Sequence, residues 1–213
     1  MNRRTLVIGT AVIAALLFIG GWFAVDRAAA PVLENGSLAD SALIRFHSPV
    51  LGPQDAPVTI VEFFDPACEA CRAMHPVLAD IRKRYPQQVR IVMRYAAFHD
   101  GSDIAVRILE TARLQNVFEP VLEALLAAQP QWADHSGARL DIAWAAAAEA
   151  GLDVDKARAE MNNDAINNLL VQDAKDVETV GVRQTPTFFV DGRPLLDFGA
   201  EQLIDMVRLQ VES

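Results

Sequence analysis

Cys68 and Cys71 are the two cysteines of this 213-residue chain, and two residues separate them. A secreted scaffold held by disulfides needs more cysteines at wider spacing, and a zinc site of four thiolates is excluded by their number. A close pair of thiols can instead exchange disulfides with the sulfur of a partner, or hold a soft ion such as Cu(I). Disulfide exchange is the leading hypothesis, and the alternative is a copper-binding protein in which Met74 or His75 adds a ligand.

The segments around the pair predict a strand followed by a helix. Residues 58–64 are β-branched and aromatic, as in a buried strand, and Asp65-Pro66 predicts the start of a helix that runs to about Arg84. Both cysteines then lie near the first turn, where the helix end lowers a thiol pKa to about 3.5–7.5 from an ordinary value of about 8.5. We therefore expect Cys68 to be the nucleophile, and Cys71 to be the more buried thiol that resolves the mixed disulfide.

The rest of the chain predicts a mixed α/β layout. Residues 89–95 alternate in polarity and predict a strand parallel to the first. From 102 to 180 the spacing is helical, which indicates an inserted helical block. Residues 187–190 and 194–196 predict a β-hairpin, and residues 200–209 predict a final amphipathic helix.

A family resemblance rests on two stretches of this chain. Residues 49–72 (PVLGPQDAPVTIVEFFDPACEACR) and 185–187 (TPT) resemble the DsbA-like thiol-disulfide oxidoreductases, and the layout over residues 49–209 is similar to theirs. The resemblance implies an α/β, thioredoxin-like fold with an inserted all-helical subdomain at about residues 102–180.

The resemblance also implies roles for residues outside the cysteine pair. It implies a cis proline at Pro186, whose loop packs against the disulfide and receives an extended substrate strand, with Thr185 in contact with the disulfide. Glu62 occupies the position of the family's buried acid, which takes the proton of the resolving cysteine. A solvated glutamate at a sheet edge is the alternative for Glu62, and its apolar neighbours disfavour it.

Glu69 and Ala70 depart from the Pro-His or Pro-Tyr dipeptide of the strongly oxidising relatives. A carboxylate beside Cys68 disfavours the thiolate, whereas Arg72, four residues after Cys68, is expected to offset part of that effect. We therefore expect a less oxidising protein, and we assign Glu69 and Ala70 a redox-tuning role.

The first residues predict a membrane or signal segment. Residues 5–25 carry no charge and are long enough to span a bilayer as a helix, and Arg3 and Arg4 precede them. The positive-inside rule places the chain after this segment outside the cytoplasm, on the periplasmic side of a bacterial inner membrane. Residues 28–30 (AAA) offer a cleavage site, so an uncleaved anchor and a cleaved signal both remain open. The expected domains are residues 1–27 as this segment, 28–56 as a tether and lead-in, and 57–213 as the thioredoxin-like domain.

Composition limits the partners. The formal net charge of −9 repels phosphate backbones, so nucleic acid is not an expected partner. Phosphate-binding and dinucleotide motifs are missing from the sequence, so no cofactor is implied. The expected function is an exported thiol-disulfide oxidoreductase of open direction, with protein thiols or disulfides as substrates and a membrane protein as redox partner. His75 is expected to be a solvated helix residue, and His99 a loop residue.

Overall fold

A computed structural model describes residues 42–134 and 136–213. The expected membrane segment, residues 5–25, and the first part of the expected tether lie outside the described residues. Within the described residues, no helix is both long enough and apolar enough to cross a bilayer.

The fold is built on a five-stranded sheet with the strand order β1-β3-β2-β6-β7. Its central pair, β2 (Val58–Phe64) and β3 (Val89–Tyr95), runs parallel, and β6 (Thr187–Val190) is antiparallel to β2. Each residue of β2 is buried, as its nearly continuous run of apolar and β-branched residues predicts, and the burial includes Glu62. Short edge strands complete the sheet, β1 (Val50–Leu51) beside β3 and β7 (Arg193–Pro194) beside β6. The expected hairpin is present, but its second strand begins one residue earlier and is shorter than expected.

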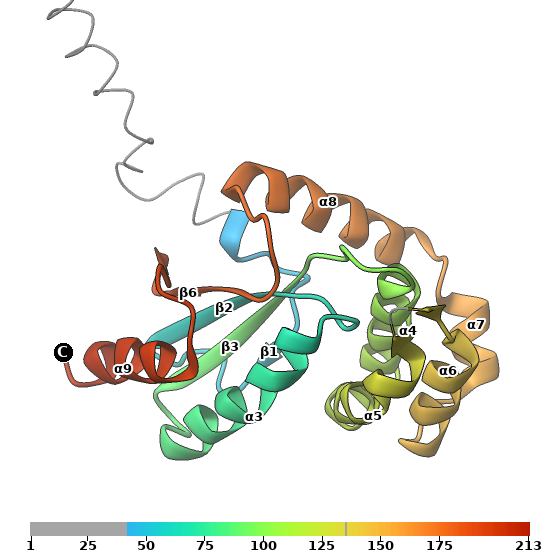
Figure 1. Cartoon of the computed structure of the whole chain (residues 1–213), viewed down its shortest axis with the longest axis horizontal. Coiled ribbons are helices and arrows are strands. Elements are labelled where there is room, and N and C mark those ends of the chain that lie inside the picture. The colour runs from blue at the N-terminus through green and yellow to red at the C-terminus, as the bar shows by residue number, and fades with distance from the viewer. Residues whose placement is uncertain (1–41, 135) are drawn as a thin grey trace, which may run out of the picture. The chain divides into compact units, whose positions relative to one another are not determined.

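Helices cover both faces of the sheet (Figure 1). α3 (Glu69–Arg84) and α9 (Ala200–Val211) lie on one face, and α8 (Asp164–Val180) lies on the other. α3 connects the parallel strands β2 and β3, so the expected strand–helix–strand unit is confirmed.

In the described part of the insertion between β3 and β6, four further helices accompany α8. They are α4 (Ser102–Leu114), α5 (Phe118–Trp132), α6 (Leu140–Glu149) and α7 (Val154–Glu160). The expectation of an all-helical subdomain is wrong in one detail, because β4 (Ala133–Asp134) and β5 (Gly137–Ala138) pair inside it. Two-residue strands are too short to leave a periodic pattern in the sequence.

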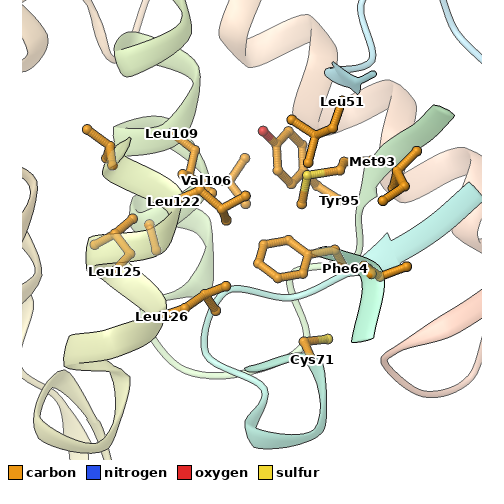
Figure 2. Packing of buried hydrophobic residues seen from close by; sticks show 14 of the residues in the cluster. Leu51, Phe64, Cys71, Met93, Tyr95, Val106, Leu109, Leu122, Leu125 and Leu126 are labelled. Atoms are coloured by element: carbon orange, nitrogen blue, oxygen red, sulfur yellow. The ribbon is translucent and has the colours of Figure 1, made fainter. Parts of the chain in front are cut away.

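A hydrophobic core joins one face of the sheet to the inserted helices α4 and α5. Figure 2 shows Phe64 and Tyr95 of the sheet facing Val106 of α4 and Leu122 of α5. Cys71 belongs to the same cluster and is fully buried. The core therefore fixes the cysteine-bearing end of α3 against the insertion.

Candidate active site

The turn that precedes the cysteines is built around Asp65. Its buried carboxylate accepts hydrogen bonds from the amides of Ala67 (2.8 Å), Phe98 (2.7 Å) and His99 (3.0 Å), and from the hydroxyl of Ser102. Asp65 therefore joins β2 to the loop that follows β3, instead of capping a helix. The expectation that α3 starts at Asp65-Pro66 is wrong, since α3 begins at Glu69 with Cys68 as its N-cap residue.

Cys68 lies at this N-terminal end of α3 with 6% of its surface exposed. Its thiol donates a hydrogen bond to the carbonyl oxygen of Thr185, with a sulfur–oxygen distance of 3.2 Å. Hydrogen bonding from the Cys71 thiol lowers the pKa of Cys68 to about 5; burial opposes this shift, and the Thr185 hydroxyl and the amides of Ala70 and Cys71 support it. Cys68 is therefore a thiolate at neutral pH, the reactive form of a cysteine.

Cys71 is the more buried thiol of the two, as expected, with 0% of its surface exposed. The amide of Asp65 donates to its sulfur at 3.4 Å. Burial, together with the hydrogen bond to Cys68 and the charge of Glu62, raises the pKa of Cys71 far above its ordinary value. Cys71 keeps its proton when Cys68 has lost its own, so the two thiols are chemically unequal.

Glu62 is buried, and the alternative of a solvated glutamate is wrong. It lies on the central strand β2, between Met93 of β3 and Phe188 of β6, with 2% of its surface exposed. Among the described residues, Oε1 of Glu62 has no hydrogen-bond partner. Burial, with the charge of Cys68 adding to it, raises the pKa of Glu62 to about 8. A carboxyl group with this pKa can hold or release a proton near neutral pH.

The loop before β6 completes the surroundings of Cys68. The peptide bond between Thr185 and Pro186 is cis, and Pro186 is buried. The Thr185 hydroxyl is also buried, and among the described residues it has no hydrogen-bond partner other than the Cys68 sulfur, whose thiolate form it stabilises. This loop offers Cys68 an acceptor, the Thr185 carbonyl, when the sulfur is protonated, and a donor, the Thr185 hydroxyl, when it is a thiolate.

Glu69 and Ala70 occupy the first two positions of α3, and Glu69 is exposed. Glu69 is not among the largest influences on the Cys68 pKa, which come from Cys71, burial and Thr185. Arg72 is engaged elsewhere, because its Nε donates to Oε1 of Gln129 at 2.9 Å. A tuning role for Glu69 and Ala70 stays a prediction.

Gln129 of α5 is a residue that the sequence did not reveal. Its side-chain amide donates to the carbonyl oxygens of Pro66 and Cys68, each at 2.9 Å, and its oxygen accepts from Arg72. These three bonds tie the inserted helices to the cysteine turn. Gln129 follows Cys68 by 61 positions, so no local pattern could indicate the contact.

A hollow of about 470 Å³ opens beside Cys68. Glu69 and Ala70 of α3 are among its lining residues, together with His99, Asp100 and Asp134. His99 is a loop residue, as expected, and it lines the same hollow as Cys68. The cysteine turn therefore borders a space that can receive a substrate segment.

The copper alternative was tested on the described residues around the cysteine pair. Within the described residues, no group of three or more His, Cys, Asp or Glu side chains is arranged to hold a metal ion. His75 lines a different hollow, with Leu51, Arg82 and Glu119. Met74 is buried in α3, where it belongs to the hydrophobic core.

Comparison with known families gives one match over most of the chain. A family model described as thioredoxin matches residues 46–206. Among curated proteins, a Na(+)/H(+) antiporter NhaA of Herminiimonas arsenicoxydans is 33% identical over 146 residues, which are 68% of this chain and 22% of that protein. An antiporter NhaA 3 of Salinispora tropica is 31% identical over 147 residues, with coverages of 68% and 22%. The chain thus spans about a fifth of the length of these curated relatives.

Solved structures share the fold. A thioredoxin-like oxidoreductase from Silicibacter pomeroyi DSS-3 superposes with a TM-score of 0.71 at 28% identity, over 83% of this chain and 99% of the other. BdbD from Bacillus subtilis gives 0.69 at 21% identity, over 78% and 94%. Wolbachia pipientis alpha-DsbA1 gives 0.68 at 17% identity, over 83% and 98%. At these lower identities the last two establish similarity of fold alone.

Proposed function

We propose that this chain, which belongs to the thioredoxin family, acts as a DsbA-like oxidoreductase. It catalyses thiol-disulfide exchange with exported proteins through Cys68 and Cys71. One observation carries the proposal: the two thiols are unequal. Cys68 has a pKa of about 5 and borders an open hollow, whereas Cys71 is buried and its pKa is raised. An inert structural pair has no need of this difference.

The exchange begins from the disulfide form when the protein acts as an oxidant. A substrate thiolate attacks Sγ of Cys68, a substrate–Cys68 disulfide forms, and the Cys68–Cys71 bond breaks. The electron pair of that bond goes to Sγ of Cys71, which takes a proton from Glu62. A second substrate thiolate then attacks the substrate sulfur of the mixed disulfide, so the substrate gains a disulfide and Cys68 leaves as a thiolate. Two electrons pass from the substrate to the protein.

The reverse sequence reduces a substrate disulfide. The Cys68 thiolate attacks, and Cys71 resolves the mixed disulfide after Glu62 accepts its proton. The substrate leaves with two reduced sulfurs, and the protein closes its own disulfide. Glu62 suits both directions, because a pKa of about 8 lets it give or take a proton near neutral pH.

We also propose a location outside the cytoplasm, at the membrane. The uncharged residues 5–25 and the preceding Arg3 and Arg4 support it. In this arrangement the substrates are protein thiols and disulfides of exported clients, and a membrane protein restores the working redox state of the pair.

Trapping an intermediate tests the proposed exchange. The Cys71→Ser protein, mixed with a peptide that carries one disulfide, should accumulate a mixed disulfide through Cys68, visible by mass spectrometry and lost on adding dithiothreitol. Wild type should convert the same peptide completely without accumulating the adduct. The Cys68→Ser protein is the matched control and should form no adduct. Equal adduct formation by both variants, or by neither, would overturn the proposal.

A further inference from the structure

A buried aspartate and a half-exposed histidine form a pair beside the cysteine turn. Nδ1 of His99 lies 2.7 Å from Oδ2 of Asp65, and the Asp65 side chain is 0% exposed against 50% for His99. The Asp65 carboxylate also receives the amide of His99 itself at 3.0 Å. Asp65 therefore holds His99 by both its backbone amide and its ring nitrogen, which fixes the orientation of the imidazole.

The orientation places the ring in the hollow of Cys68. His99 and Cys68 are both lining residues of that space, although 31 positions separate them and they belong to different elements. Gly101 lets the loop that carries His99 pack closely against β5. Its φ of +74° suits glycine, and a side chain there would collide with Ala138 of β5.

The charges around His99 favour its protonated form. Burial by itself lowers the pKa of His99, but the hydrogen bond and charge of Asp65, with the charge of Cys68, raise it above the ordinary value. Among the described residues that line the hollow, the other ionisable groups besides Cys68 are acidic: Glu69 of α3, Asp100 of the same loop and Asp134 of β4. Asp134 pairs with a cation outside the lining, because Nη2 of Arg139 lies 3.3 Å from its Oδ2.

We propose that His99, held by Asp65, is the electrostatic partner of the Cys68 thiolate, with Asp65 as the residue that positions it. This inference rests on the proposed function and names a residue that helps to set the reduction potential of the Cys68–Cys71 pair. The imidazolium stabilises the thiolate and hence the dithiol form of the protein. It therefore makes the Cys68–Cys71 disulfide a stronger oxidant than the pair would be without it.

Thermodynamic linkage relates the pKa of His99 to the pKa of Cys68. If the imidazolium stabilises the thiolate, the thiolate must raise the pKa of His99 by the same amount that the imidazolium lowers the pKa of Cys68. Closing the disulfide removes the thiolate, so the pKa of His99 should fall on oxidation. A ring that serves only to order the loop has no reason to titrate differently in the two redox forms.

His99→Asn and His75→Asn are a matched pair of variants for the test. The side-chain amide of asparagine can replace Nδ1 as the donor to Asp65, so His99→Asn keeps the loop contact and removes the charge. His75→Asn makes the same change on α3 in a different hollow. In the full-length protein, thiolate absorbance at 240 nm gives the Cys68 pKa, glutathione equilibria give the reduction potential, and NMR gives the His99 pKa in both redox forms of wild type.

The proposal predicts a Cys68 pKa about half a unit higher in His99→Asn than in wild type, since the pair is partly exposed to solvent. This shift is a threefold weaker acid, and it lowers the reduction potential by about 14 mV at 29.6 mV per tenfold change. The His99 pKa should fall by a similar half unit on oxidation, and His75→Asn should match wild type.

An unchanged Cys68 pKa in His99→Asn, or a His99 pKa that is the same in both redox forms, would overturn the proposal while exchange activity persists. Loss of the proposed function itself would look different. In that case wild type and both variants would all fail to exchange disulfides with glutathione.

Discussion

At the scale of single residues, Glu62 combines a redox task with a cost in stability. Its carboxyl group is fully buried on the central strand and its pKa is raised to about 8. The unfolded chain loses this proton near pH 4.5, but the folded chain retains it until about pH 8. Stability should therefore fall as pH rises through this window, and above it the full penalty is present.

Glu62→Gln removes that penalty and the proton carrier together. The variant should equal wild type in stability at pH 4 and exceed it by roughly 3 kcal/mol at pH 7, at about 1.36 kcal/mol per pKa unit. Urea unfolding of the dithiol form at both pH values checks this. Resolution by Cys71 should slow in the same variant, by about 100-fold or more, in stopped-flow exchange with a disulfide peptide. Equal stability profiles with unchanged kinetics would contradict both roles of Glu62.

Thr185 is expected to tune Cys68 through its hydroxyl. Thr185→Val removes a donor to the thiolate, and the Cys68 pKa should rise by about one unit, since hydrogen bonds to charged groups contribute about 1.5–3 kcal/mol. Thr187→Val is the matched control, because that hydroxyl donates instead to the carbonyl of Gln184 at 2.8 Å. Titration of the thiolate absorbance at 240 nm measures the Cys68 pKa in both variants. A similar Cys68 pKa in the two would contradict the tuning role of the Thr185 hydroxyl.

At the scale of elements, sequence patterns predicted the helices and strands that form through residues close together in the chain. The apolar run of β2, the alternation of β3 and the helical spacing of the insertion each indicate the element that is found. The start of α3 escapes such patterns because Asp65 bonds Phe98 and His99, more than thirty positions away. Gln129 and His99 join the site by the same kind of long-range contact, which spacing along the chain does not reveal.

The burial of Arg94 shows the same limit of local patterns. Alternation in β3 gives no sign that this arginine is 0% exposed. Its guanidinium lies 2.8 Å from Asp173 and 2.6 Å from Asp176, both on α8. Asp173 also accepts the amide of Tyr95 at 2.8 Å. This buried ion pair attaches α8 to the sheet face opposite α3.

Breaking that attachment should be costly. Asp173→Asn leaves the Arg94 charge buried with reduced compensation, and we expect a loss of about 3–5 kcal/mol in the free energy of unfolding. Asp205→Asn makes the same substitution in an exposed pair with Arg208 and should change stability by less than about 0.5 kcal/mol. Urea denaturation measures both, and similar losses in the two variants would contradict a structural role for the buried pair.

At the scale of the whole molecule, the proposed location outside the cytoplasm agrees with the proposed disulfide exchange. Disulfides persist in oxidising compartments, whereas cytosolic thiols are kept reduced. A phosphatase that is active only outside the cytoplasm, fused after Ser213, should therefore be active in bacteria. Replacing Leu16 and Leu17 with arginine should abolish that activity, since each charge costs about 2.5–3.5 kcal/mol at the centre of a membrane helix. Activity that survives this change, or is missing from the original fusion, would contradict export through residues 5–25.

The proposed chemistry of the whole molecule depends on Cys68 being the reactive thiolate of an unequal pair. The most direct measurement is the rate of iodoacetamide labelling of the reduced protein between pH 3 and 10, with the labelled cysteine identified by peptide mass spectrometry. We predict labelling of Cys68 with a midpoint near pH 5, and Cys71 protected throughout while the protein stays folded. A midpoint near the ordinary thiol value of about 8.5, or equal labelling of the two cysteines, would contradict this chemistry.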